Sequence, residues 1–389
     1  MSRSPLNVVR ILDLSRLLPG PVATLHLADL GADVIKIEDT GAGDYARTMG
    51  AGPDGVSWFY RAVNRNKRGL RLDLKQAAGR EVLLRLVDSA DILVESFRPG
   101  VMDRLGVGYE ALRARNPRLV YCAITGYGQD GPWALRAGHD LNYIAQAGVL
   151  DQTGTAGEFA SAPPAIPALQ IGDLLGGAMS AVAALLAALH QARATGEGSF
   201  VDVAMAESVL AHNLFPLFAH AAGQSPARGA DLLTGGHANY AVYRTQDNRY
   251  LAVAALEEKF WQLFCDAVGR PQWKARYAES ADPALHREVA ALIAGRTLAE
   301  WDALLSPVDC CVTPVLTLPE ALAHPQAQAR GMAVAADGMT QLAPPFRISG
   351  WQFEVARTAP AAGEHSDEIL AALGYGAEAI AQLRQSRIV

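Results

Sequence analysis

The chain has 389 residues, of which 50% are hydrophobic and 19% charged, and these values are typical of a globular protein with two domains, or three small ones. They exclude a disordered or fibrous chain. The formal net charge is −6, from 34 Lys and Arg against 40 Asp and Glu, so the chain lacks the basic excess expected of a nucleic-acid-binding protein.

Strand-like and helix-like patterns alternate over the first third of the chain. The expected strands are 7–14, 32–39, 69–74, 91–97 and 119–128, and the expected helices are 22–31, 76–90 and 101–117. Strand–helix–strand units of about 30 residues predict a parallel sheet in a doubly wound α/β domain. No GxGxxG follows the first strand, so the dinucleotide-binding fingerprint is missing.

The middle of the chain contains its longest apolar stretch. A Gly-, Ala- and Pro-rich segment at 149–170 precedes this stretch, 176–191, and a strand and a helix are expected at 198–221. Because the apolar stretch is shorter than the about 20 residues that a bilayer span needs, we expect a buried helix and no membrane contact.

The pattern changes after a linker-like stretch at 223–236. An α+β pattern fills 237–325, and the last residues combine a β-like segment, "PPFRISGW", with a helical end. We therefore expect a large domain made of 1–222 and 326–389 and a small central domain over 223–325.

The N-terminus and the cysteines indicate the compartment. No apolar core with a small-residue cleavage site is apparent near the N-terminus, so no secretion signal is expected. The four cysteines show no CxxC spacing, which argues against structural zinc. We therefore expect a cytoplasmic protein without a metal site.

His139 is the first candidate for chemistry. It stands beside Asp140 in "AGHDLNYIAQAG", at the mouth of an apolar segment. Taken alone, a loop histidine is more often structural than catalytic, but it can also transfer protons near neutral pH.

Asp173, in "IGDLLGGAMSA", is the second candidate. It stands at the start of the apolar helix, where an aspartate is also a common N-cap. Gly172, Gly176 and Gly177 leave the space around its carboxylate free of side chains, so that a ligand or another backbone can come close.

Glu257 is the third candidate, because it directly follows an expected buried strand, "YLAVAAL". A side chain at a strand end can project into a cleft, and the alternative is a solvated cap of the next helix.

A basic turn and one further arginine could bind an anion. The turn consists of Asn64, Arg65, Asn66, Lys67 and Arg68 and precedes a strand. Such runs usually lie on solvated faces. Arg98 lies just past the end of an expected strand, where open α/β sheets bind ligands, so it is a candidate phosphate or carboxylate contact.

Motifs along nearly the whole chain resemble one family. They are "RILDLSRLLPGPVATLHLADLGADVIKIED", "NRNKRGLRLDLK", "LVESFRPGVMDRLGVGYEAL", "ITGYGQDGPW", "GDLLGGAMSAVAALLAALHQARATGEGSFVDVAMAES" and "HPQAQARGM". These motifs are similar to those of the family III CoA-transferase superfamily (CaiB/BaiF type), which includes CoA-transferases and α-methylacyl-CoA racemases. The resemblance is strongest to the racemases.

The resemblance implies an interlocked homodimer in which each protomer has a Rossmann-like large domain, built from both chain ends, and a smaller α+β domain. It also implies that an acyl-CoA thioester is the substrate and that no separate cofactor is needed. The residues implied in binding the substrate or its CoA portion are Asn64, Arg65, Lys67, Arg98, Tyr127 and Gly128.

The superfamily divides by mechanism. In the transferases the acid matching Asp173 is a nucleophile, whereas in the racemases it shares acid–base work with the histidine of a "GHD" motif, matched here by His139. A glutamate matching Glu257 orients that histidine, and Asp140 is expected to support the imidazole. The central-domain loop offers only Gly235 and Gly236 of the glycine run that some transferases carry, which also favours a racemase.

The chemistry of inversion explains the pair. Inverting a carbon α to a thioester needs one group to remove the proton from one face and a second to return a proton to the other. A histidine and a partly desolvated aspartate can exchange these roles. We expect backbone N–H groups at the start of the Asp173 helix to stabilise the enolate oxygen.

Two other functions stay open from the sequence. A CoA-transferase would use Asp173 as its nucleophile, and a non-enzymatic protein could bind CoA thioesters without chemistry. The segment from His237 to Tyr240 departs from the small residues and proline common in racemases, and it is expected to border the acyl pocket, so the acyl group stays unassigned.

Overall fold

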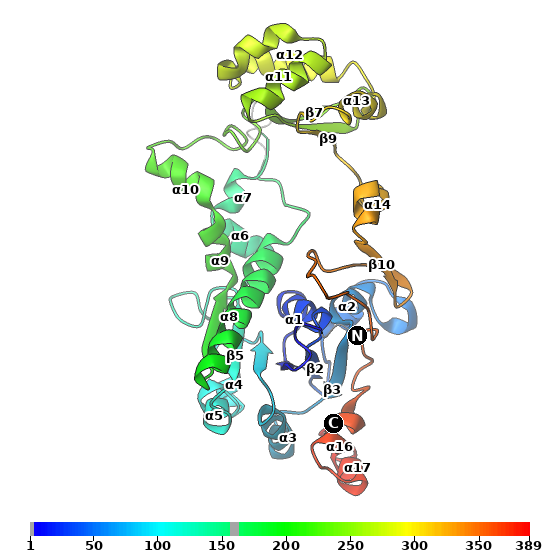
Figure 1. Cartoon of the computed structure of the whole chain (residues 1–389). Coiled ribbons are helices and arrows are strands. Elements are labelled where there is room, and N and C mark those ends of the chain that lie inside the picture. Colours follow the sequence, from blue (N-terminus) through cyan, green and yellow to red (C-terminus); the bar gives the residue numbers. More distant parts are fainter. Residues whose placement is uncertain (1–3, 156–162) are drawn as a thin grey trace. The chain divides into compact units, whose positions relative to one another are not determined.

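The computed structural model describes residues 4–155 and 163–389 (Figure 1). These residues form two compact units. Unit 1 consists of Met1–Ala147, Ala168–His212 and Gln328–Val389, and unit 2 consists of Gly148–Pro167 and Asn213–Ala327.

Unit 1 is built on a six-stranded sheet. Its strands are β1 (Arg10–Asp13), β2 (Asp33–Glu38), β3 (Lys67–Arg71), β4 (Ile92–Glu95), β5 (Val120–Thr125) and β6 (Phe200–Ala204). They are all parallel and lie in the order β3-β2-β1-β4-β5-β6. This is the doubly wound order, so the predicted α/β class with a parallel sheet is confirmed.

Helices cover both faces of this sheet. One apolar core lies between the sheet and α1 (Pro19–Asp29), α8 (Ser180–Thr195) and α9 (Met205–His212). The other lies between the sheet and α3 (Ala77–Val87), α5 (Tyr109–Arg115) and α16 (Ser366–Ala372). Successive strand residues point to opposite faces, as Ile11 and Leu12 do in β1, and this alternation supplies both cores.

Shorter elements complete unit 1. They are η1 (Tyr45–Thr48), η2 (Pro53–Gly55), α2 (Trp58–Asn64), α4 (Val101–Arg104), α6 (Asp140–Gln146), β10 (Ala333–Ala336), β11 (Met339–Leu342) and α17 (Ala377–Gln385). The β-like segment 344–351 forms no strand, because Pro344 and Pro345 lack the N–H groups that a strand ladder needs.

The apolar helix is longer than the sequence pattern indicated. The π-helix Gly172–Met179 (η4) continues directly into α8, and together Gly172–Thr195 is one 24-residue helix whose most apolar 18-residue window has a mean hydropathy of 1.7. Its length therefore does not exclude a membrane span, and the length argument made from the sequence is wrong. Within unit 1 its buried side chains pack in the apolar core against α1, α9 and the sheet, as those of a core helix do.

Unit 2 is an α+β unit with a separate core. Antiparallel strands β7 (Tyr240–Arg244), β8 (Tyr250–Ala254) and β9 (Val312–Pro314) form its sheet. Its helices are α7 (Val149–Gln152), α10 (Leu214–Ala221), α11 (Glu258–Ala267), η5 (Pro271–Glu279), α12 (Pro283–Ile293), α13 (Leu298–Leu305) and α14 (Leu318–Ala323), and α15 (Pro325–Ala329) spans the boundary with unit 1. Trp261, Phe264 and Trp301 are buried at the centre of this core.

The units divide the chain differently from the predicted domains. Gly148–Pro167 and α10, which the sequence analysis placed in the large domain, belong to unit 2. One reason is that the Arg228 Nε donates to the carbonyl oxygen of Asp151, across a sequence separation that a local pattern does not reveal.

A buried ion pair fixes the carboxyl end of β1. The Asp13 carboxylate accepts hydrogen bonds from the Lys67 Nζ at 3.0 Å, the Thr24 Oγ1 at 2.7 Å and the Ser15 N–H at 3.0 Å. Lys67 and Asp13 are both fully buried, and the lysine also bonds the Asn64 Oδ1 at 3.0 Å. Burial alone would raise the pKa of Asp13, but the lysine charges and these hydrogen bonds hold it far below its usual value.

A second buried lysine, Lys36 in β2, holds the turn that follows β1. Its Nζ donates to the Ser15 carbonyl oxygen at 2.9 Å and pairs with Asp44 at 2.8 Å. Asp44 in turn accepts from the Leu17 N–H at 3.0 Å. These contacts set the path of the chain between β1 and α1.

Removing one charge from this buried network should make the protein less stable. We expect Lys67→Met to lower the free energy of unfolding by about 3 kcal/mol, because the Asp13 carboxylate would lose its direct partner in the interior. The exposed Lys75 gives the matched variant Lys75→Met, whose stability should stay within about 0.5 kcal/mol of the wild type. Urea unfolding measures both, and an equal effect of the two variants would contradict this account.

Candidate active site

A cavity of about 660 Å³ lies at the carboxyl ends of β1, β4 and β5. The sheet order reverses between β1 and β4, and doubly wound folds bind ligands at such a switch point. Turns after the three strands contribute Arg16, Arg98 and Gly126 to its lining. His139 and Asp173 line the same cavity, so the structure brings these two predicted residues together.

His139 is held at the start of α6. Its backbone N–H donates to the Asn142 Oδ1 at 3.0 Å, and its side chain is exposed. The position before α6 therefore presents the imidazole at the cavity rather than in the core.

Tyr143 anchors the loop that carries His139. Its hydroxyl donates to the Gly138 carbonyl oxygen at 2.6 Å. A Cβ at Gly138 or Gly126 would lie 2.7 or 2.4 Å from the Tyr143 Cε1, so the ring fits only because both positions are glycine. The glycine of the "GHD" motif thus makes room for the ring that fixes its neighbour.

Asp173 is half-buried in the first turn of the π-helix η4. Burial raises its pKa to about 6, and the nearby Asp140 carboxylate adds to the increase, while His139 opposes it. A carboxyl group with this pKa is a usable base near neutral pH and can also hold a proton. Short π-helical segments occur often at functional sites.

Asp140 connects the two candidates. Its Oδ1 accepts the backbone N–H of Asp173 at 3.0 Å, while its own residue begins α6 directly after His139. It therefore ties the two segments together and places a negative charge beside Asp173.

The predicted enolate donors are already bonded at two positions of the Asp173 helix. The N–H of Asp173 donates to Asp140 and that of Leu174 to the Gln170 carbonyl at 2.9 Å, so neither is available to an enolate oxygen.

The glycines near Asp173 serve packing. A Cβ at Gly176 would lie 2.6 Å from the Met205 carbonyl oxygen, and one at Gly177 would lie 2.7 Å from the Pro19 Cβ. A Cβ at Gly172 would lie 3.0 Å from the Asp140 Oδ1. These positions admit another part of the chain rather than a ligand.

Three arginines line the cavity. Arg98 is exposed just after β4, and among the described residues no ion pair holds it. The Arg16 guanidinium pairs with Asp39 at 2.6 Å and lies 5.4 Å from the centroid of the Phe97 ring. The guanidinium carbon of Arg136 lies 4.1 Å from the centroid of the Trp133 ring, on which it stacks. Arginine suits phosphate binding, and Arg16 was not among the predicted ligands although it lies three residues after the end of the first strand.

The basic turn does not reach this cavity. Lys67 and Asn64 are fully buried around Asp13, and Arg65 is buried in an ion pair with Asp29 at 2.6 Å. Buried and paired in this way, none of the three offers a donor to a ligand. The structure gives them an interior role in place of the predicted CoA contact, because the acidic partners of Lys67 and Arg65 lie far away in the sequence and Asn64 bonds Lys67.

Tyr127 and Gly128 support the site from behind. The Tyr127 ring packs edge-on against Trp133 and Tyr143, with centroids 5.2 and 5.4 Å apart. Gly128 has φ = +86°, a turn conformation that glycine adopts without strain, and its N–H donates to the Thr125 Oγ1 at 3.0 Å. Neither lines the cavity.

Glu257 and the segment 237–240 lie in unit 2. Glu257 is exposed and precedes α11 as its N-cap residue, without a side-chain capping bond. His237 bonds the Ser280 Oγ at 2.9 Å through its Nδ1, and Asn239 is buried with its Nδ2 donating to the Ala255 carbonyl. Tyr240 lines a cavity of about 500 Å³ inside unit 2, together with Gly235 and His286.

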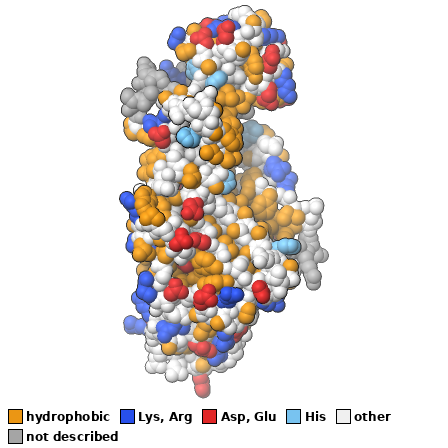
Figure 2. Space-filling model, turned by 90° about the vertical axis from the view of Figure 1, so that its left-hand side faces the viewer, with side chains coloured by type: hydrophobic (Ala, Val, Ile, Leu, Met, Phe, Trp, Pro, Cys, Tyr) orange, Lys and Arg blue, Asp and Glu red, His pale blue; other side chains and the backbone are white. Residues whose placement is uncertain are grey.

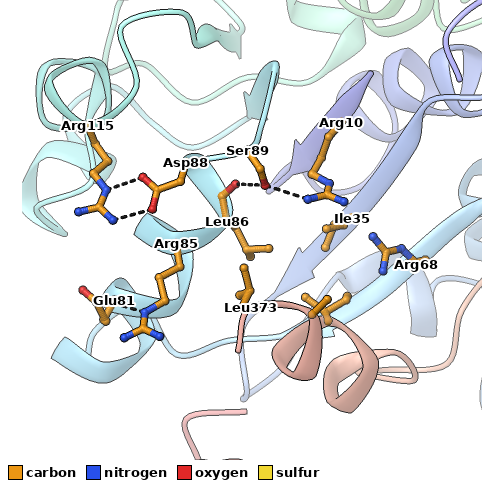
Figure 3. A pocket seen from close by; sticks show the side chains of 12 residues that line it. Arg10, Ile35, Arg68, Glu81, Arg85, Leu86, Asp88, Ser89, Arg115 and Leu373 are labelled. Atoms are coloured by element: carbon orange, nitrogen blue, oxygen red, sulfur yellow. Dashed lines mark hydrogen bonds and ion pairs between the residues drawn. The ribbon is translucent and has the colours of Figure 1, made fainter. Parts of the chain in front are cut away.

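A further cavity, of about 640 Å³, lies at the opposite, amino-terminal edge of the sheet (Figure 3). Each of its arginines is neutralised by a neighbour. Arg115 and Arg85 bond Asp88 and Glu81, and Arg10 and Arg68 share Asp33. Because these charges are paired, this cavity is a poorer anion site than the one at the carboxyl edge. Among residues 4–155 and 163–389, no group of three or more His, Cys, Asp or Glu side chains gathers as a metal site would.

The fold and the cavity define a doubly wound α/β enzyme with a His–Asp pair and arginines at its switch point. The model of CoA-transferase family III matches residues 6–366. The chain is 34% identical to α-methylacyl-CoA racemase from Homo sapiens, covering 99% of this chain and 97% of that protein. It is also 34% identical to acetyl-CoA:oxalate CoA-transferase from Acetobacter aceti, covering 90% of each.

A solved structure agrees with these sequence relatives. The crystal structure of a CAIB/BAIF family protein from Brucella suis matches with a TM-score of 0.83 at 30% identity, covering 95% of this chain and 99% of that one. The chain therefore belongs to CoA-transferase family III, and the predicted family is confirmed. Racemase and transferase relatives are similarly close, so family membership leaves the reaction open.

The raised pKa of Asp173 predicts how its substitution affects stability. Between pH 4 and pH 6 the native carboxyl holds a proton that the unfolded chain has released, so ionisation costs stability as pH rises through this window. Asp173→Asn should therefore be more stable than the wild type at pH 8, by about 1 to 3 kcal/mol, and equal to it at pH 4.

Denaturant unfolding of the two proteins at both pH values measures this difference. The exposed Asp309 gives the control Asp309→Asn, which should show no such pH-dependent gain. A gain for Asp173→Asn that is the same at pH 4 and pH 8, or no gain at all, would show that the carboxyl pKa is not raised.

Proposed function

We propose that this protein is an acyl-CoA racemase or epimerase. It interconverts (R)- and (S)-2-methylacyl-CoA thioesters by removing the α-proton and returning one through an enolate. The observation that carries the proposal is that His139 and Asp173 line one cavity, with the pKa of Asp173 raised to about 6. Inversion needs two such groups, one basic and one protonated.

The two groups exchange roles with the enantiomer. For one enantiomer the ionised Asp173 removes the α-proton and the protonated His139 supplies the new one. For the other, neutral His139 is the base and Asp173 is the acid. Because burial raises its pKa to about 6, the Asp173 carboxyl can hold or release a proton at working pH.

The remaining parts of the proposal concern orientation and binding. Asp140 fixes the start of the Asp173 helix through its bond to the Asp173 N–H, and Glu257 orients the imidazole. The CoA phosphates bind Arg98, with Arg16 and Arg136 nearby in the lining. CoA is part of the substrate, and the reaction uses no separate cofactor.

The protein is proposed to act as an interlocked homodimer in the cytoplasm. Figure 2 shows hydrophobic side chains exposed on the face where α8 and α9 lie. The exposed hydrophobic side chains of the π-helix, α8 and α9 in unit 1 are Leu175, Met179, Leu186 and Leu210. Separately, α10 of unit 2 exposes Leu214, Phe215, Leu217 and Phe218. Exposed apolar patches of this kind often mark protein interfaces.

A CoA-transferase is the second candidate, because relatives with transferase names are as similar as the racemase. In that reaction the Asp173 carboxylate attacks the thioester carbonyl, forms an acyl anhydride and releases CoA as the thiolate. The thiolate then attacks the Asp173 carbonyl of the anhydride, which releases the first acid as its carboxylate and leaves an Asp173–CoA thioester. The carboxylate of a second acid displaces CoA from this thioester to form a new anhydride, and the thiolate attacks the acyl carbonyl of that anhydride, which gives the new acyl-CoA and frees Asp173.

The two reactions are separated by one incubation. A single enantiomer of a 2-methylacyl-CoA is kept with the protein in D₂O, without an acceptor acid, and the α-proton is followed by NMR. Deuterium should enter the α-position while optical purity is lost. No exchange, followed by CoA transfer once a free acid is added, would contradict the racemase and support the transferase; inactivity in both assays would reject both.

Removing the imidazole should stop inversion without affecting substrate capture. We expect His139→Ala to lower the racemisation rate by at least about 100-fold, because general acid–base groups contribute about 10² to 10⁴. Its affinity for CoA should change less than about twofold, since His139 contacts the reacting carbon and not the nucleotide. A rate within a few-fold of the wild type would rule out the role of His139.

A further inference from the structure

Glu95 is a buried acid that the proposed reaction does not use. It is the last residue of β4 and is 5% exposed. The next three residues, Ser96, Phe97 and Arg98, form the turn that lines the cavity at the switch point. A charged side chain in the interior directly before a ligand-binding turn needs a reason.

The contacts of Glu95 lead directly to that turn. Its Oε2 accepts the Phe97 N–H at 2.6 Å, and its Oε1 accepts the Tyr121 hydroxyl at 3.3 Å. The turn is held from its other side as well, because the Arg16 N–H donates to the Ser96 Oγ at 3.1 Å. The carboxylate therefore fixes the backbone one residue before Arg98.

The surroundings of Glu95 make its charge depend on pH near neutrality. It faces Tyr121 and Cys122 of β5, Asp103 of α4 and Asp202 of β6. Burial raises the pKa of Glu95 to about 7, with Asp103 and Asp202 adding to the increase and the two hydrogen bonds opposing it.

We propose that Glu95 is a positioning residue for the CoA subsite, and that its ionised carboxylate holds the Phe97–Arg98 turn in the form that binds the substrate phosphates. Protonation exchanges a charge-assisted hydrogen bond for a weaker neutral one and loosens the turn. Affinity for CoA therefore falls as pH falls through neutrality. Repulsion between Glu95 and a bound anion acts in the opposite direction, so the proposal requires that the ordering of the turn outweighs this repulsion.

This inference rests on the proposed binding of CoA beside Arg98, but not on the reaction that follows. The test is direct binding of CoA by calorimetry between pH 5.5 and pH 8.5. Glu95→Gln keeps the size and the neutral hydrogen-bonding groups of the protonated acid. At pH 8.5 it should bind CoA about tenfold more weakly than the wild type, and at pH 5.5 equally well.

Two comparisons make the result specific. The exposed Glu110, in the first turn of α5, gives the control Glu110→Gln, which should follow the wild type at every pH. Tyr121→Phe removes one bond that favours the ionised form of Glu95, so the pH at which wild-type affinity falls should move upwards in that variant.

A double-mutant cycle tests the route through Arg98. In an Arg98→Met background, Glu95→Gln should have no further effect on CoA affinity, because the group that it positions is absent. If the two substitutions changed the free energy of CoA binding additively, Glu95 would not act through Arg98. Equal binding of Glu95→Gln and the wild type at pH 8.5, or a deficit that is the same at every pH, would overturn the proposal. The result does not depend on whether the protein is a racemase or a transferase, since only binding and no turnover is measured.

Discussion

The buried pair of Asp13 and Lys67 is the interaction on which the site depends. It joins β1 to β3, and through Thr24 it also reaches α1, so three elements are fixed around one carboxylate. The turn between β1 and α1, which brings Arg16 to the cavity, begins directly after this aspartate, the last residue of β1. Lysine and carboxylate are costly to bury, and only their direct contact and full hydrogen bonding make the arrangement stable.

Asp173 is also a carboxylate whose pKa is set by burial and neighbouring charges, but its pKa shifts in the opposite direction from that of Asp13. Asp13 has lysines beside it, and its pKa lies far below the usual value. Burial raises the pKa of Asp173, and the second acid beside it, Asp140, adds to the increase. The first carboxylate is permanently charged and structural, whereas the second can change its protonation near neutral pH, as a proton-transfer group must.

The fold class and the two residues that meet at the cavity, His139 and Asp173, could be singled out from the sequence because both depend on local patterns. Alternating strands and helices indicated the parallel sheet, and the motifs around His139 and Asp173 carried the resemblance to the family. The interior role of Lys67 could not be predicted, because its partner Asp13 lies 54 residues earlier.

Other features escaped the sequence for related reasons. The sequence shows that Arg16 lies shortly after the first strand. Its position at the switch point could not be predicted, because that depends on the order of the strands in the sheet. The glycines after Asp173 indicated a close approach without identifying the approaching group, which is the Met205 backbone at Gly176. A basic run predicts a nearby anion, and a glycine run predicts a close approach by a ligand or a backbone. Which group takes that place is determined by the tertiary fold.

The central claim is that His139 and Asp173 act on opposite faces of one carbon. It is tested most directly by measuring α-proton exchange in D₂O for each enantiomer separately, with His139→Ala and Asp173→Asn. The account predicts that each variant exchanges one enantiomer only, a different one in each case, and inverts neither. A variant that exchanges and inverts both enantiomers would contradict it.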